Sequence, residues 1–352
     1  MKKYISIFFI LCIVFSTTTT MAEDVNDPII WKYKTSSWVI STATTDDQSY
    51  TSASALDGSL YFFDKTGNLL WNKNTGHRVV SLTFSKDYSK ISAVTGERIY
   101  LIDKSGKALS DYKTVQGSYM VINQDGNYIG GSSSNIYAIL YKDARPEWDY
   151  KTGDKINAVS ITPDGSTLAA ASSDNFVYLV KSGFLLWKYD TKAPVISVAV
   201  SPDASYVVCG SGSFESKEGD APKDYRVFLF DKDGKLIWDY KIGYTVSSVS
   251  ITPDGSYIAV GSWDKKLHIF SKSGEHLKEF KTDGNVLSVS ITPDGQNVVV
   301  GSTDTYVYYL NIASMPTPEN KSSNNLISFI TPGIILLIIA GLIGIWKMKK
   351  KK

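Results

Sequence analysis

The sequence predicts an all-β fold, a seven-bladed β-propeller, and the first observation behind this is a tryptophan that returns at a nearly constant interval in segments such as LLWKYDT and LIWDYKI. These tryptophans are Trp31, Trp71, Trp148, Trp187 and Trp238. Two weaker copies of the same segment place Ser110 and Lys278 at the tryptophan position. A repeat of about 40 residues is typical of propellers and solenoids.

The second observation is an aspartate that recurs in step with the tryptophan. Its seven positions are Asp47, Asp87, Asp125, Asp164, Asp203, Asp254 and Asp294. Both series keep intervals of 38 to 40 residues, with a single interval of 51. Because two separate markers give the same count, the chain contains seven units.

Four strands are predicted in each unit. Two Val- and Ile-rich runs flank a Pro-Asp-Gly or Pro-Asp-Ala turn, as in SVSITPDGSYIAVGS, which is typical of a tight hairpin. An aromatic and branched run such as FVYLV follows as the third strand. A second turn of the form Asp-x-x-Gly, for example Asp64 to Gly67, then leads into the strand that carries the tryptophan. Four antiparallel strands in each of seven units predict the propeller.

The two ends of the repeat region predict how the ring closes. The last unit stops after its third strand, Tyr306 to Ile312, whereas the chain begins with an unpartnered fourth strand, Ile29 to Thr35. We expect these two segments to pair, because the ring then has no open edge that could join another chain.

The repeats resemble two known families. The first unit, Ala55 to Trp71, is similar to the repeat of pyrroloquinoline-quinone (PQQ) propellers, whose blades end in Asp, Gly and Trp at this spacing. Later units resemble WD40 repeats in their Ser-Pro-Asp or Thr-Pro-Asp-Gly hairpins, although Phe63-Asp64 stands where a WD40 blade has Trp-Asp. The resemblance covers Ile29 to Ile312 and implies the fold, because propellers carry many unrelated functions.

The regions outside the repeats predict export and a membrane anchor. The uncharged run after Lys3 fits a secretory signal, and a charge-free apolar segment near the C-terminus is followed by lysines, which stay on the inner side of a membrane. An uncleaved N-terminal anchor and a processed C-terminal sorting signal around Pro332 are the alternatives. The predicted parts are a signal peptide (1–22), the propeller (23–312), a flexible stalk (313–325), one transmembrane helix (326–346) and a basic cytoplasmic tail (347–352).

The charge of the exported part bears on its partners, and the cysteine content bears on its thiol chemistry. The formal charge is +2, but without the two lysines of the signal and the five of the tail, 30 basic and 35 acidic residues remain, a balance of −5. Nucleic acid is therefore not an expected partner. Cys12 lies in the signal, so Cys209 is the single thiol of the mature protein, in an apolar strand where we expect it to be buried.

The sequence predicts a protein that is not an enzyme and has no cofactor. The quinone enzymes that the first unit resembles typically have eight blades, a bound calcium and adjacent cysteines, whereas this chain has seven units and one mature cysteine. His77, His268 and His276 are not spaced as metal ligands in the sequence, so no metal site is expected.

One face of the ring is the candidate partner-binding face. The interval of 51 residues contains an insertion, Ser213 to Asp224, between the second and third strands of blade five. Insertions in repeat scaffolds often mark a binding face, although a solvated loop is the alternative. Loops that share this face supply the rest of the candidate set. The set is His77, Arg78, Phe214, Glu215, Lys217, Glu218, Asp220, Lys223, Tyr244 and Trp263. The stalk is expected to leave from the opposite face, so that this one points away from the membrane.

These observations predict a single-pass membrane protein with its propeller outside the cytoplasm and its C-terminus inside. Its expected function is to bind or scaffold a protein or glycan of the cell envelope. The alternatives are a quinone-dependent or carbohydrate-active propeller enzyme and an envelope assembly factor that resembles bacterial outer-membrane assembly propellers.

Overall fold

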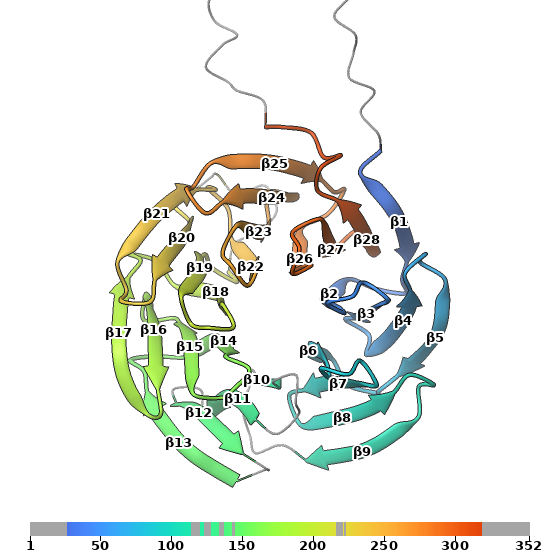
Figure 1. Ribbon diagram of the computed structural model, residues 1–352, viewed down its shortest axis with the longest axis horizontal. Helices are drawn as coiled ribbons and strands as arrows, with labels where there is room; N and C mark the ends of the chain where they lie inside the picture. The colour runs from blue at the N-terminus through green and yellow to red at the C-terminus, as the bar shows by residue number, and fades with distance from the viewer. Residues whose placement is uncertain are drawn as a thin grey trace, which may run out of the picture.

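A computed structural model shows seven four-stranded antiparallel sheets arranged in a ring around a central axis (Figure 1). The predicted seven-bladed propeller is therefore confirmed. The structure describes residues 27–113, 120–122, 128–133, 137–142, 145–215, 221 and 223–318.

The blades follow one another along the chain, and the strands of each blade run from the inside of the ring to its outside. Blade one is β2 (Val39–Thr44), β3 (Tyr50–Ala55), β4 (Ser59–Asp64) and β5 (Leu69–Asn74). Blade two is β6 (Val79–Phe84), β7 (Lys90–Thr95), β8 (Arg98–Asp103) and β9 (Ala108–Lys113). Blade three is β10 (Met120–Ile122), β11 (Tyr128–Ser133), β12 (Tyr137–Lys142) and β13 (Arg145–Lys151). Blade four is β14 (Ile156–Ile161), β15 (Thr167–Ser172), β16 (Phe176–Lys181) and β17 (Phe184–Asp190). Blade five is β18 (Val195–Val200), β19 (Tyr206–Ser211), β20 (Arg226–Asp231) and β21 (Leu236–Lys241). Blade six is β22 (Val246–Ile251), β23 (Tyr257–Ser262), β24 (Lys266–Ser271) and β25 (His276–Lys281). Blade seven is β26 (Val286–Ile291), β27 (Asn297–Ser302), β28 (Tyr306–Asn311) and β1 (Ile29–Lys34).

The predicted closure of the ring is confirmed in blade seven. The first strand β1 pairs antiparallel with the last strand β28, with Trp31 opposite Tyr309 and Lys34 opposite Tyr306. The Trp31 ring stacks on Tyr309 and also lies 5.3 Å from Phe63 of blade one. The N-terminal strand therefore completes one blade and packs on the next.

The core follows from the strand patterns. In blades one and four to seven the second and third strands are largely buried, and β27 is buried over its whole length, because neighbouring blades cover both of their faces. Outer strands such as β21 alternate between half-buried and exposed residues, because one face points to solvent. Cys209 in β19 is fully buried, as expected.

The outer-strand tryptophans Trp187 and Trp238 pack between blades. Trp187 of blade four lies 5.4 Å from Phe230 of blade five, and its indole N–H donates to the Lys232 carbonyl (3.0 Å). Trp238 contacts blade six in the same way, at Phe270 and the Lys272 carbonyl. Each tryptophan thus joins its blade to the Asp-x-x-Gly hairpin of the next one.

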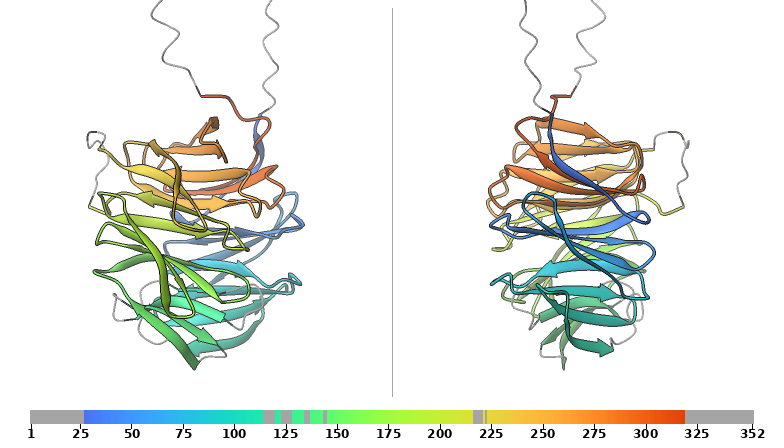
Figure 2. Two further views of the ribbon diagram at one scale, coloured as in Figure 1. Left: turned by 60° about the vertical axis from the view of Figure 1, so that its left-hand side comes forward. Right: turned by 90° about the vertical axis from the view of Figure 1, so that its right-hand side faces the viewer.

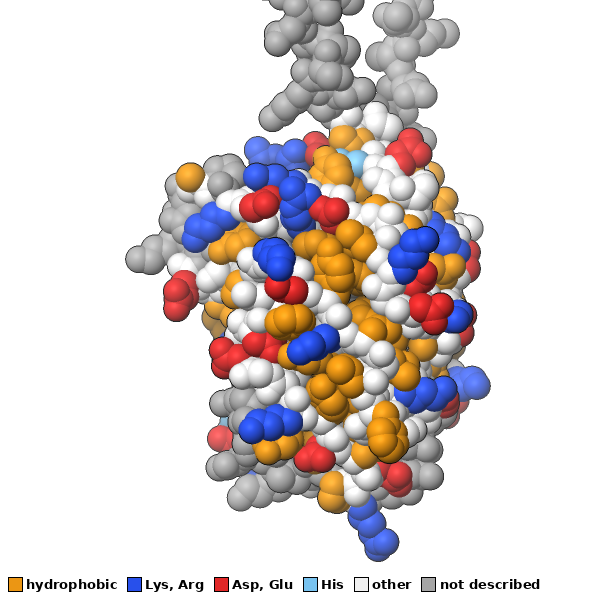
Figure 3. Space-filling model, turned by 90° about the vertical axis from the view of Figure 1, so that its left-hand side faces the viewer, with side chains coloured by type: hydrophobic (Ala, Val, Ile, Leu, Met, Phe, Trp, Pro, Cys, Tyr) orange, Lys and Arg blue, Asp and Glu red, His pale blue; other side chains and the backbone are white. Residues whose placement is uncertain are grey.

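The outer rim is mixed in character. Phe184, Leu186 and Ile237 of β17 and β21 are exposed, and on this side of the ring hydrophobic side chains lie among scattered charges (Figure 3).

Both ends of the described chain lie at the same edge of the ring, beside blades six and seven (Figures 1 and 2). After β28 the chain crosses to blade six, where the Glu279 N–H donates to the Pro316 carbonyl (3.1 Å). Met315 is buried in the hydrophobic core between blades six and seven, so the first part of the predicted stalk includes a residue that packs on the ring.

The predicted signal peptide (1–22) and transmembrane helix (326–346) fall outside the described residues. Within the part of the chain that is described, no helix has the length and apolar character needed to cross a bilayer.

Candidate functional site

In blades one, four, five, six and seven, two loop positions are held together at one end of the central channel by a backbone hydrogen bond. One lies just before the inner strand and the other just after the second strand. The Leu56 N–H donates to the Trp38 carbonyl (2.8 Å) in blade one, and the Trp263 N–H donates to the Thr245 carbonyl (3.0 Å) in blade six. The same bond joins Ser173 to Lys155, Gly212 to Pro194 and Thr303 to Asn285. These bonds fix a double ring of loop residues around the channel mouth.

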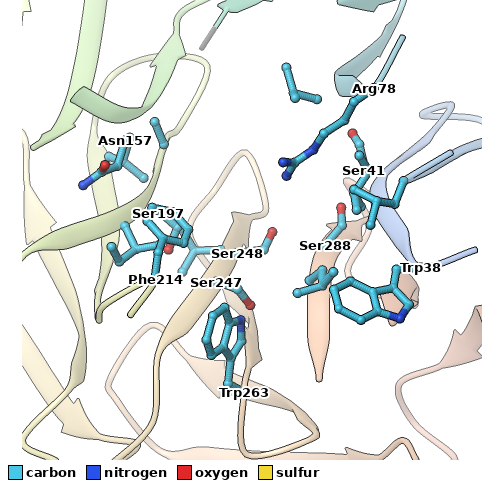
Figure 4. A pocket seen from close by; sticks show the side chains of 18 residues that line it. Trp38, Ser41, Arg78, Asn157, Ser197, Phe214, Ser247, Ser248, Trp263 and Ser288 are labelled. Atoms are coloured by element: carbon cyan, nitrogen blue, oxygen red, sulfur yellow. The ribbon is translucent and has the colours of Figure 1, made fainter. Parts of the chain in front are cut away.

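A cavity of about 560 Å³ lies at this end of the channel (Figure 4). The inner strands β2, β6, β14, β18, β22 and β26 contribute to its wall, and the loops contribute to its rim. Its residues are Trp38, Ile40, Ser41, Leu56, Arg78, Val80, Asn157, Ala158, Ile196, Ser197, Val198, Phe214, Ser247, Ser248, Val249, Trp263, Leu287 and Ser288.

Three aromatic side chains and one cation surround the mouth of the cavity. Trp38 and Phe214 are each about half exposed, at 49% and 51%. Trp263 is half-buried, and its indole N–H finds no hydrogen-bond partner among the described residues. Arg78 is exposed, and its guanidinium points into the opening (Figure 4). The mouth therefore offers aromatic surface and one positive charge, whereas the unpaired indole nitrogen of Trp263 is itself buried.

The polar groups of the wall, in contrast, already have partners. The Ser197 hydroxyl donates to the Val246 carbonyl (2.9 Å), and the Asn157 amide donates to the Val195 carbonyl (2.8 Å), in each case across a blade boundary. The Ser248 hydroxyl accepts from the Val289 N–H (3.1 Å) in the same way. These bonds hold neighbouring inner strands together, so their donors and acceptors serve the ring itself.

The structure brings part of the predicted candidate set to this cavity. Arg78, Phe214 and Trp263 line it. His77 is exposed in the same loop as Arg78, and its carbonyl accepts from the Thr75 hydroxyl (2.7 Å).

Three other described members of the candidate set, Glu215, Lys223 and Tyr244, lie apart from the cavity lining. Tyr244 is half-buried and Glu215 is exposed, and neither belongs to the lining. Lys223 is bonded through its N–H to the Gly243 carbonyl (2.7 Å). Lys217, Glu218 and Asp220 fall outside the described residues.

Trp38 and Leu56 also line the cavity, and neither residue was predicted from the sequence. The repeat contained the signal. Trp38 follows Trp31 by seven residues, as Arg78 follows Trp71, and Leu56 occupies the same position in blade one as Trp263 in blade six. Comparison of loop positions across the blades would have selected both residues.

A second group of functional side chains lies in blade six, away from the channel mouth. The hairpin between β24 and β25 brings His268 and His276 together, with ring nitrogens 3.2 Å apart. Glu279 completes a group of three whose ligand atoms all lie within 4.8 Å of one another. Burial, together with the nearby His268, lowers the pKa of His276 to about 4. The spacing of the histidines in the sequence gave no indication of this arrangement.

Comparison with known proteins adds a partial match. A family model described as a family of unknown function (DUF5711) matches residues 137–311, from β12 to β28. No curated protein matches the chain.

Proposed function

We propose that this protein is an extracytoplasmic, membrane-anchored binding module that holds a protein partner of the cell envelope on the face with the cavity mouth. The observation that carries the proposal is the cluster of Trp38, Phe214, Trp263 and Arg78 around one opening. Tryptophan and arginine are the residues that most often dominate the energy of protein interfaces, particularly where they surround a pocket.

The lining of the cavity favours a protein over a sugar or a substrate. Recognition of a sugar needs several unpaired polar groups, and those of the wall already hold the inner strands together. Among the described residues that line the cavity, none is acidic, a histidine or a cysteine. The available chemistry is aromatic surface and the Arg78 guanidinium, which suits a partner loop that carries an apolar side chain beside a carboxylate.

The orientation of the molecule is part of the same proposal. The apolar segment 326–346 and the lysines that follow it support a C-terminal anchor with the propeller outside the cytoplasm. With the anchor connected through the edge of blades six and seven, the cavity mouth is free to face a partner. An envelope assembly role is compatible with this arrangement and depends on the identity of that partner.

The test combines a change on the proposed face with a matched change on the opposite face. Deletion of Phe214 to Lys223 together with Trp263→Ala should weaken capture of the partner from native envelopes at least about tenfold, as expected for the loss of interface anchors. The melting temperature should change little, because loop changes on a repeat scaffold seldom reach its core. Lys65→Ala with Lys104→Ala, in the hairpins of the opposite face, is the control.

Capture is measured by quantitative identification of bound proteins and glycans, and affinity is then measured with the purified partner. If the control variant abolishes capture while the deletion has no effect, the binding face is the opposite one. If glycans are captured in place of a protein, the partner class is wrong.

A further inference from the structure

Blade six departs from the repeat at two positions whose side chains are in contact. The third residue of the third strand is tyrosine in four blades, at Tyr61, Tyr100, Tyr178 and Tyr308, but it is His268 in blade six. The outer-strand residue two places before the tryptophan position is apolar in every other blade. These apolar residues are Ile29, Leu69, Ala108, Pro146, Leu185 and Leu236, and blade six has His276 instead.

The replacement of tyrosine by His268 keeps a contact to an aspartate that the tyrosines of other blades also make. Tyr308 donates its hydroxyl to Asp304 (2.8 Å) in blade seven, and Tyr178 makes the same bond to Asp174 in blade four. His268 Nε2 makes the equivalent contact to Asp264 (2.8 Å). A tyrosine would therefore satisfy Asp264, and that contact does not account for the histidine.

The replacement of an apolar residue by His276 places a second imidazole beside His268. With its Nε2–H donated to Asp264, His268 presents the lone pair of Nδ1 toward His276 Nε2, 3.2 Å away. A carboxylate that holds the far nitrogen of an imidazole is the usual support of a metal-binding histidine, because it fixes the tautomer and the orientation of the ring. Two imidazole nitrogens thus lie close enough together for one ion to bridge them.

The spacing matches a zinc centre. Zinc–nitrogen distances of about 2.0–2.1 Å with tetrahedral angles place two ligand nitrogens about 3.3 Å apart, close to the 3.2 Å between the two rings. A Glu279 carboxylate oxygen lies within 4.8 Å of one ring nitrogen of each histidine. Two histidines and one glutamate form a known zinc ligand set that leaves a fourth position open.

The surroundings also suit an ion. His268 is buried, and Phe270 and Tyr240 lie 4.7 and 5.5 Å from the His276 ring, which makes an apolar wall on one side. The Glu279 side chain is 23% exposed, so an ion can enter from solvent. Lys266 donates to both carboxylate oxygens of Glu279 (2.9 and 3.0 Å), at the position where Arg98 pairs with Asp111 in blade two. Binding of an ion therefore requires one of the two oxygens to turn from Lys266 to the ion.

We propose that His268, His276 and Glu279 bind a divalent transition-metal ion, zinc in the first place, with Asp264 as the positioning residue for His268. The ion joins β24 to β25 at the point where the C-terminal segment is bonded to Glu279. This proposal is independent of the partner-binding face.

The test uses two variants that restore residues of the other blades and are therefore expected to fold. His268→Tyr recreates the contact seen in blades four and seven, and His276→Leu inserts the residue of blades one, four and five. The full chain is stripped with a chelator and titrated with zinc sulfate against a chromogenic zinc indicator. Cobalt binding is followed in parallel by visible absorption, which reports tetrahedral coordination.

The wild-type chain should bind one zinc ion, show the cobalt bands and unfold at a higher temperature with zinc. His268→Tyr and His276→Leu should lose all three properties, Asp264→Asn should weaken binding about 10–100-fold, and His77→Ala should behave as wild type. Absence of stoichiometric zinc binding by the wild type would overturn the proposal. So would equal binding by the two restored variants, because the ion would then lie elsewhere.

Discussion

The boundary between two blades is set by a contact between one tryptophan and one glycine. Gly234 has a positive φ of 79°, and a Cβ added to it would lie 2.6 Å from Cγ of Trp187. Gly274 stands in the same relation to Trp238, at 2.7 Å. The tryptophan and the Asp-x-x-Gly turn thus recur together because each turn holds the indole of the preceding blade.

A pair of glycine variants separates the two reasons for glycine at this position. Gly76 also has a positive φ, 73°, but a Cβ there would meet nothing within 4 Å. Gly76→Ala should cost only the backbone term of about 1–2 kcal/mol, whereas Gly234→Ala should cost about 1–3 kcal/mol more because the indole is displaced. Urea unfolding of the two variants measures the difference, and equal losses would mean that the indole contact contributes nothing to this requirement.

At the scale of the strand, β1 joins the N-terminal end of the described chain to the C-terminal end by pairing with β28. It forms the outer strand of blade seven, and its Trp31 is buried among Phe63 and Tyr309 of two blades. Truncation of a buried tryptophan alone costs about 3–5 kcal/mol. Loss of the whole strand also exposes the edge of β28.

Deletion of residues 23 to 35 should therefore destabilise the entire ring by more than the tryptophan term and make the protein aggregate. Thermal unfolding and size-exclusion chromatography measure the two effects. Deletion of 23 to 26 alone is the control, because it leaves β1 and the bond from Asn311 to the Pro28 carbonyl in place. A ring that is monomeric and equally stable without β1 would show that closure does not depend on this strand.

The elements that the sequence predicted are those with local causes. Turn residues and alternating strands repeat along the chain, so a strand that is hard to recognise in one unit can be assigned from its equivalents in the other units. The pairing of β1 with β28 was predicted by counting the strands in the first and last units. The histidine pair was missed because it depends on the register across the β24–β25 hairpin, where a bulge sets His276 opposite Phe270. The burial of Met315 was missed because it depends on contacts between the C-terminal segment and the core formed with blades six and seven.

Across the whole molecule, hairpin aspartates recur whose carboxylates accept hydrogen bonds from neighbouring hydroxyl and backbone N–H groups. In the hairpin of blade six, hydrogen bonds from the hydroxyl and the backbone N–H of Ser256 lower the pKa of Asp254 to about 2. Hydrogen bonds from Thr66 and Asn68 lower the pKa of Asp64 in an outer hairpin to about 2 as well. The folded ring therefore binds these protons less readily than the unfolded chain does.

This difference predicts acid sensitivity that is shared by the blades. A lowered carboxyl pKa contributes stability that is complete above the ordinary value near 3.8 and is lost as the pH falls toward 2. The melting temperature should fall through that window. Asp254→Asn together with Asp294→Asn should lower the melting temperature at pH 7 but make the melting temperature less dependent on pH in the acid range. A melting temperature that stays constant between pH 6 and 2, or an unchanged slope in the double variant, would contradict this interpretation.

The closing strand also sets the order of events during biosynthesis. Thr35 and Thr305, which are bonded backbone to backbone at the end of β1, are separated by 270 residues. At about 5–20 residues per second, the ribosome completes the partner roughly 15–50 s after the first strand emerges. During that interval every other blade can assemble while the first strand waits unpaired. Ring closure therefore has to wait for the synthesis of β28, and until then the unpaired edge of the first strand is open to pairing with a neighbouring copy.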